Sequence, residues 1–312
     1  MQRVFPQKTF MKLPRNHPID NSRYRIKQVL AMVNGVQFSQ PPEIYAMDIG
    51  TRAAVILVPG GLGAAWAGDA YHPAGKHIVG ESAIRLGVNL ISYVLGSTEY
   101  GRFLAQEFPT YEGATRPGDT MHFAAAKYAG SWDVNPAIQN SLLKGLRDNT
   151  DIDVDYFPRA VGLDSEQIGQ SPLLFMTGHY DFQLSDAEAD NLRKYLLRGG
   201  TVVASAAAGL KPFDVALRRE LKKMFPDQEL VKLPPSHPMF TLGFNPVTSV
   251  EYTSAALRDD PTLEYPTFYG LFLDNRLAVI YTPYDIQSGI NRESNAYAKG
   301  ITSDDALRVA IN

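Results

Sequence analysis

The sequence contains no cysteine, and this absence excludes disulfide bonds, thiolate metal ligands and a cysteine nucleophile together. A long hydrophobic run is also missing. The longest apolar stretch, residues 53–67, is too short and too rich in glycine and proline to span a membrane. Neither sign of charge dominates, because 30 basic residues balance 33 acidic ones, which leaves no electrostatic footprint for nucleic acid. The first residues lack the apolar core of a signal peptide, so the chain as given is expected to be soluble.

The most informative stretch that is present, residues 172–209, predicts a strand, a loop, a helix and a second strand. Both strands, residues 173–176 and 201–204, are short apolar runs typical of central strands. The helix between them begins after Ser185, with Glu188 three residues later, a spacing that predicts a capping box. This order is the crossover unit of a parallel α/β sheet. We therefore predict an α/β fold in which helices flank a parallel sheet.

The same patterns predict the neighbouring elements. Residues 152–157 alternate apolar and acidic side chains, as an outer strand should. The region 248–272 is interpreted as extra short strands laid over the sheet edge, and Asp304 as the cap of the last helix. The other predicted elements are strands at residues 121–128 and 277–281 and helices at residues 135–147 and 213–225.

An internal repeat connects the two halves of the chain. Three blocks recur in the same order and at nearly the same spacing, which indicates an internal duplication. The matching blocks are residues 1–19 with 221–239, residues 41–59 with 265–283, and residues 83–89 with 306–312.

The repeat sets the predicted domain boundaries. Residues 1–105 correspond to the carboxyl-terminal half of a first module, residues 106–119 have the composition of a linker, and residues 120–312 form a second module whose last helix is incomplete. Both ends of the chain then fall inside modules. A fragment of a longer protein would explain this, and so would a head-to-tail oligomer in which each half-module completes a neighbour. The fragment is favoured because open heterologous assembly is rarer.

Several features together resemble a known family. They are Thr177-Gly178-His179 after the first apolar run, the helix at residues 184–200, the Phe-Asp and Arg-Arg-Glu of residues 213–220, and the proline-rich segment at residues 224–240. With these features the chain resembles the bacterial domain of unknown function 4159 family, which is grouped with class I glutamine amidotransferase-like and trehalose-utilisation-like α/β folds. The resemblance implies a flavodoxin-like sheet and a periplasmic or cell-envelope setting, and it implies no reaction.

The sequence departs from the amidotransferases at both catalytic positions. In that group the nucleophilic cysteine lies in the sharp turn after a strand such as residues 201–204, where this chain has Ser205 followed by three alanines and a glycine. The His-Pro-Glu that follows a late strand is replaced by Thr282-Pro283-Tyr284. Glutamine hydrolysis is therefore excluded.

The candidate catalytic residues are His179, Asp181 and Ser205, which could form a Ser-His-Asp set if the two strand ends are neighbours. The simpler alternative is that His179 bonds to backbone groups of its own loop. A ligand at the strand ends would contact His179, Tyr180, Ser205 and His237, because open α/β sheets bind ligands there. His179, Asp181 and His237 could hold a metal ion, but their spacing lacks the helical i, i+4 pattern, so we predict no metal.

Two further motifs have structural interpretations. His17 and His237 lie in a repeated Leu-Pro-x-x-His-Pro, which predicts a fixed turn in both copies. Gly60-Gly61-Leu62-Gly63 misses the spacing of a dinucleotide-binding loop, so no cofactor is predicted.

Two hypotheses for the function remain. The first is a non-catalytic binding or scaffold protein made of degenerate amidotransferase-like modules, with a protein partner or self-association. The second is a hydrolase that acts on a glycan or ester through Ser205 and His179.

Overall fold

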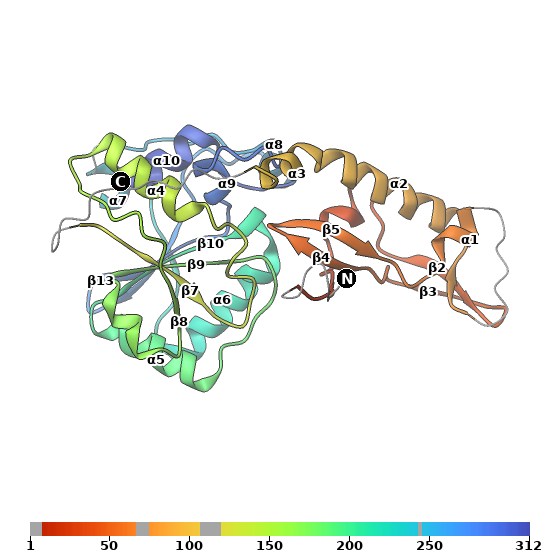
Figure 1. Ribbon diagram of the computed structural model, residues 1–312, viewed down its shortest axis with the longest axis horizontal. Helices are drawn as coiled ribbons and strands as arrows, with labels where there is room; N and C mark the ends of the chain where they lie inside the picture. The colour runs from red at the N-terminus through yellow and green to blue at the C-terminus, as the bar shows by residue number, and fades with distance from the viewer. Residues whose placement is uncertain (1–7, 67–74, 107–119, 243–244) are drawn as a thin grey trace. The chain divides into compact units, whose positions relative to one another are not determined.

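The computed structural model describes residues 8–66, 75–106, 120–242 and 245–312. The chain divides into two compact units, Met1–Ala105, here called unit 1, and Gln106–Asn312, here called unit 2 (Figure 1). The predicted linker lies, apart from Gln106, outside the described residues. Within the described ranges, no helix is long and apolar enough to cross a membrane.

Unit 2 contains a mixed α/β fold around a seven-stranded sheet in the order β11-β12-β13-β10-β9-β7-β8. The pairs from β13 to β8 are parallel, and β11 and β12 add an antiparallel edge. The prediction of a largely parallel sheet flanked by helices is therefore confirmed. The strands are β7 (Ala124–Lys127), β8 (Ala160–Gly162), β9 (Leu173–Gly178), β10 (Thr201–Ala206), β11 (Val231–Lys232), β12 (Tyr269–Leu273) and β13 (Arg276–Thr282).

Helices cover both faces of this sheet. Figure 1 shows α5 and α6 on one face and α4, α9 and α10 on the other. Side chains alternate along β9, so Leu174 and Met176 pack in the core under α5 and α6 while Phe175 packs in the opposite core. The helices are α4 (Ile138–Asn149), α5 (Asp186–Leu197), α6 (Lys211–Met224), α9 (Gln287–Ile290) and α10 (Ser303–Ile311).

The crossover predicted at residues 172–209 is confirmed. Strands β9 and β10 are parallel neighbours, from Leu173 opposite Thr201 to Gly178 opposite Ala206. Helix α5 joins them and begins with the predicted capping box, in which the Ser185 side chain accepts from the Glu188 amide and the Glu188 carboxylate accepts from the Ser185 amide.

The prediction of an outer strand at residues 152–157 is wrong. Only Val154 forms an isolated bridge, to Met121, and the edge strand is β8. The alternation has another cause, because Val154 and Tyr156 pack into the core while the Asp155 carboxylate accepts hydrogen bonds from Phe157 and Arg159.

The interpretation of residues 248–272 as extra strands is also wrong in part. The region contains a short helix, α8 (Ser254–Asp259), and only its last residues enter β12. Thr253 caps α8 by accepting from the Ala256 amide at 3.3 Å, and this local bond overrides the strand preference of the surrounding valine, tyrosine and threonine residues. The last helix has Thr302 at its N-cap, with Asp304 in the first turn instead.

Unit 1 contains two three-stranded sheets, in the orders β1-β4-β5 and β3-β2-β6. Helix α2 is the longest of the described helices in this unit. The elements are β1 (Met11–Lys12), η1 (Pro18–Asp20), β2 (Val29–Val33), β3 (Val36–Gln40), β4 (Tyr45–Ile49), β5 (Arg52–Leu57), α1 (Leu62–Trp66), β6 (His77–Ile78), α2 (Gly80–Gly96) and α3 (Thr98–Leu104).

The β1-β4-β5 sheet of unit 1 has the same internal register as the β11-β12-β13 edge of unit 2. Lys12 pairs with Tyr45 in the first, and Lys232 pairs with Tyr269 in the second. Both hairpins also shift register at the same place, between Met47 and Asp48 in β4 and between the corresponding residues of β12. A bulge at a matched position is specific, because it depends on one extra residue in one strand.

The repeated His-Pro motif forms the predicted turn in both units. His17 Nδ1 accepts from the Ile19 amide and His237 Nδ1 accepts from the Met239 amide, both at 3.2 Å. Each histidine thereby caps the short helical turn that its proline begins, η1 in unit 1 and α7 (Pro238–Thr241) in unit 2.

In unit 1 a buried asparagine of α2 forms hydrogen bonds with η1 and the loop that follows it. The Asn89 side chain is fully buried, accepts from the amides of Arg23 and Tyr24, and donates to the carbonyls of Ile19 and Tyr24. Asn312, at the matching position of α10, accepts from the Asn245 amide and donates to the Asn245 carbonyl.

We expect Asn89→Ala to destabilise unit 1 by about 2–3 kcal/mol, because four backbone groups lose their partner. Trp66 lies in unit 1 and Trp132 in unit 2, so urea unfolding of the full chain in a Trp132→Phe background reports unit 1 alone. Glu81→Ala, an exposed change on the same helix, is the control and should cost under about 0.5 kcal/mol. Equal midpoints for the two variants would refute the role of Asn89.

Candidate functional site

The carboxyl ends of β9, β10 and β13 meet at one edge of the unit 2 sheet. Ser205 lies opposite Thr177 of β9 and opposite Thr282 of β13. In open α/β folds this edge is where ligands bind. The sequence prediction depended on the ends of β9 and β10 being neighbours, and they are.

Ser205 has a structural environment. It has no exposed surface, and its hydroxyl donates to the Tyr284 carbonyl at 3.2 Å and accepts from the Ile286 amide at 3.4 Å. The Thr177 hydroxyl donates to the Ser205 carbonyl at 3.1 Å. The serine therefore ties the end of β10 to the segment after β13, and a substrate would have to displace that segment to reach it.

His179 and Asp181 lie in the loop after β9. His179 is buried, and its ring packs against Tyr180 with the centroids 4.2 Å apart. Asp181 is exposed and accepts from both terminal nitrogens of Arg219 on α6 at 3.0 Å. The described side-chain bonds of Ser205 and Asp181 reach Tyr284, Ile286 and Arg219, not His179. The Ser-His-Asp set therefore stays a prediction.

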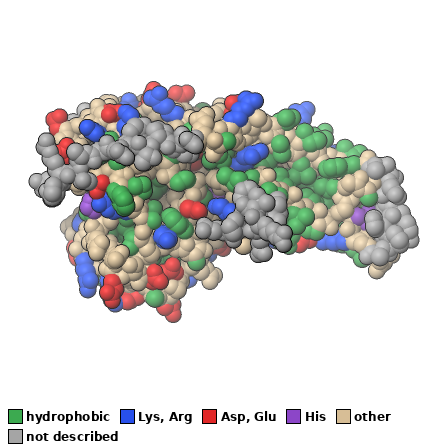
Figure 2. Space-filling model, in the orientation of Figure 1, with side chains coloured by type: hydrophobic (Ala, Val, Ile, Leu, Met, Phe, Trp, Pro, Cys, Tyr) green, Lys and Arg blue, Asp and Glu red, His purple; other side chains and the backbone are tan. Residues whose placement is uncertain are grey.

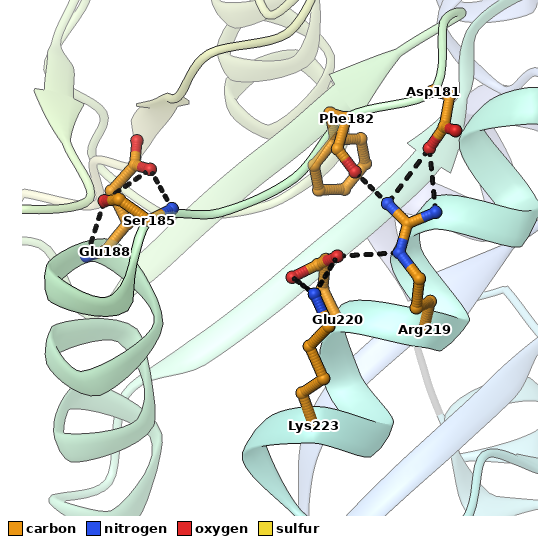
Figure 3. A network of polar contacts seen from close by, with 7 residues as sticks. All are labelled: Asp181, Phe182, Ser185, Glu188, Arg219, Glu220 and Lys223. Atoms are coloured by element: carbon orange, nitrogen blue, oxygen red, sulfur yellow. Dashed lines mark hydrogen bonds and ion pairs between the residues drawn. The ribbon is translucent and has the colours of Figure 1, made fainter.

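Arg219 organises this loop (Figure 3). It also donates to the Phe182 carbonyl and to the Glu220 carboxylate, which is almost fully buried and paired with Lys223 as well. The network holds the loop after β9 against α6, which makes Asp181 an anchor of that loop.

His237 lies away from the other predicted ligand residues. It caps α7 after β11, and β12, β13 and β10 lie between β11 and β9 in the sheet. Its ring meets Phe240 and Phe272 edge-on. In the part of the chain that the structure describes, no group of three or more histidine, aspartate or glutamate side chains could hold a metal ion.

The strand-end site contains a pair of acidic residues, Asp285 and Glu293, that sequence reasoning missed. The Asp285 carboxylate, 2% exposed, accepts from the Ala208 amide at 2.6 Å, the Ser288 amide at 2.9 Å and the Ser288 hydroxyl at 2.8 Å. That hydroxyl also lies 3.0 Å from Glu293 Oε2. The Asn135 side chain donates to Glu293 Oε1 at 2.6 Å.

The Ser288 hydroxyl connects the two carboxyl groups. It lies within hydrogen-bond distance of Asp285 and of Glu293 and has a single proton to donate. Two backbone amides stabilise the charged form of Asp285. Burial and the nearby Asp285 raise the pKa of Glu293 to about 7. Burial also raises the pKa of Asp285, against the amide bonds that lower it.

The turn after β10 is strained and pinned by this pair. Ala208 has a φ of 52°, in the left-handed region that non-glycine residues seldom adopt. Its amide donates to Asp285, and its carbonyl accepts from the Lys299 amide at 3.1 Å. The next residue, Gly209, has a φ of 62°, and a Cβ there would overlap the Lys299 carbonyl. The Asp285 carboxyl group therefore closes the turn after β10.

A groove of about 590 Å³ lies at the opposite edge of the sheet, next to the residues that precede β9 and β10. It does not include any of the predicted site residues. Its lining residues are Glu166, Ile168, Gly169, Ser171, Pro172, Asn191, Lys194, Tyr195, Arg198, Gly199 and Gly200.

The raised pKa of Glu293 predicts that unit 2 loses stability as the pH rises. The unfolded glutamate ionises near pH 4.5, whereas the folded one holds its proton to about pH 7. The stabilisation is complete below pH 4.5 and is lost as the pH rises through 7. Glu293 is partly exposed, so we expect a loss on the order of 2 kcal/mol.

Urea unfolding of unit 2, followed by Trp132 in a Trp66→Phe background, measures this loss at pH 5, 6, 7 and 8. Glu293→Gln should remove most of the slope, and Glu229→Gln, at an exposed position, should leave it unchanged. An unchanged slope in Glu293→Gln would show that another group carries the proton.

Comparison with known proteins agrees with the resemblance noted in the sequence. No curated protein matches the chain. Residues 1–95 and 122–312 match the family described as Domain of unknown function (DUF4159). These two ranges cover most of both units. The chain therefore belongs to the DUF4159 family.

Proposed function

We propose that the protein is a non-catalytic binding or scaffold protein built from degenerate amidotransferase-like modules. The observation that carries this proposal is the bond from the Ala208 amide to the buried Asp285 carboxylate. A hydrolase of this architecture needs an accessible nucleophile in the turn after the strand, with amide groups free to bind an oxyanion. Here the hydroxyl of Ser205 is fully buried, and the Ala208 amide of the turn is occupied by a carboxyl group of the protein itself.

The second part of the proposal is that unit 1 is a duplicate of the carboxyl-terminal half of unit 2. The shared register, bulge, histidine caps and asparagine bonds support it. A further pair of contacts does so as well. The Leu30 amide donates to the Ser82 hydroxyl in unit 1, and the Glu251 amide donates to the Asp305 carboxylate in unit 2. Ser82 and Asp305 occupy the same place in the repeat.

At the place of Asp285, the duplicate has no carboxylate. In unit 1 the Ile78 amide donates to the Gly60 carbonyl. In unit 2 the matching Ile301 amide donates to the Asp285 carbonyl, so Gly60 occupies the position of Asp285. A module can therefore keep its hairpin and helix without the strand-end carboxylate. This supports a role for the repeat in assembly rather than in chemistry.

The competing hypothesis, a glycan or ester hydrolase that uses Ser205 and His179, is tested by turnover. We expect the full chain to show no hydrolysis that depends on Ser205 across panels of aryl esters and aryl glycosides. Ser205→Ala and His179→Ala are compared with Ser236→Ala, an exposed control. Turnover that is lost in Ser205→Ala and His179→Ala, with circular dichroism and melting temperature retained, would overturn the binding-protein proposal.

A further inference from the structure

Unit 1 exposes an apolar surface formed by the edge of β5 and one stripe of α2. The stripe follows helical spacing, with Ile84, Ile91 and Leu95 exposed by 58%, 61% and 67%. Leu57, at the end of β5, is 49% exposed. Figure 2 shows the hydrophobic side chains gathered over α2. We call these four residues and the free edge of β5 the open face.

The edge of β5 has no charged side chain beyond Arg52, and the bulge that it shares with β13 does not prevent β13 from pairing on both sides. Among the described residues β5 pairs only with β4. Edge strands normally carry charges, prolines or bulges that prevent pairing with another chain. After Arg52, β5 continues as Ala-Ala-Val-Ile-Leu without a charge. Its sequence is that of a strand with a neighbour on both sides.

In unit 2, the strand and helix that correspond to β5 and α2 are covered by other elements. Strand β13, the counterpart of β5, pairs in parallel with β10, and Val279 lies opposite Val202. Val279 and Tyr281 have no exposed surface, whereas their counterparts in β5, Val55 and Leu57, are partly exposed. The missing neighbour of β5 is therefore a strand of the β10 type.

Helices complete the cover in unit 2. Leu307 of α10, the counterpart of Ile84, packs so closely on α4 that a Cβ at Gly145 would overlap its side chain. On the other face of the sheet, the Tyr281 hydroxyl donates to the Asp214 carboxylate of α6 at 2.8 Å. In unit 2, therefore, α10 packs on the apolar side of α4, while α6 contacts β13 on the other face of the sheet.

From these matches we infer that the open face is a docking surface for a separate α/β unit of the kind formed by residues 120–220. The unit adds a parallel strand to β5 and lays an apolar helix over Ile84, Ile91 and Leu95. This is strand addition in the parallel sense, with backbone hydrogen bonds for affinity and the apolar stripe for specificity. The inference deepens the proposed function, on which it rests, by naming the partner class.

The test supplies such a unit to the full chain. A second copy of residues 120–220 is joined directly ahead of residue 1. The distance along the chain from the copy to Phe5-Pro6 then equals the distance from residue 220 to Phe225-Pro226. Hydrogen exchange of the β5 amides is then measured in the fusion and in the natural chain. We expect exchange at β5 to slow at least tenfold, and binding of an apolar dye to α2 to fall several-fold.

A matched control carries Val202→Asp and Val203→Asp in the added copy only, which places charges in the strand that should pair with β5. This fusion should leave β5 exchanging as in the natural chain. Unchanged β5 exchange in the unmodified fusion, whether or not the added copy folds, overturns the inference. Protection of β5 in the natural chain that grows with protein concentration also overturns it, because the occupant is then a second copy of the chain. Hydrolase activity would instead refute the proposed function and leave β5 exchange unaffected.

Discussion

The bond between the Ala208 amide and the Asp285 carboxyl group connects the ends of two central strands of unit 2, β10 and β13. Ala208 follows β10, Asp285 follows β13, and Asp285 also holds the first turn of α9 through Ser288. A buried carboxylate is stable only when donors surround it, and here two amides and a hydroxyl do so. The strain at Ala208 persists because these bonds over-determine its conformation. The Asp285 carboxyl group therefore fixes the arrangement of the strand-end edge.

Much of the fold could be predicted from local patterns. The Ser185 cap, the apolar runs of β9 and β10 and the helix between them each carry a short-range signal, and all three are present. The prediction of a strand at residues 152–157 failed because burial of Val154 and Tyr156 in a loop produces the same alternation as an outer strand. Local pattern cannot separate these two causes, since both place every second side chain in the core.

The candidate site was predicted only in part. The ends of β9 and β10 adjoin as expected, but the acidic pair of Asp285 and Glu293 follows no motif. Asn135, which bonds to Glu293, comes from a part of the chain far from both. The sequence offered one signal, the absence of the amidotransferase catalytic residues from the positions that the resemblance implies, and this signal does not point to Asp285 or Glu293.

We propose that the strand-end edge of unit 2 has a structural role. Labelling of the native chain with a serine-directed fluorophosphonate, followed by mass spectrometry of the peptides, tests this proposal. We expect no adduct at Ser205, because its hydroxyl is fully buried and bonded to Tyr284 and Ile286. A stoichiometric adduct at Ser205 in the folded protein, abolished by His179→Ala, would contradict it.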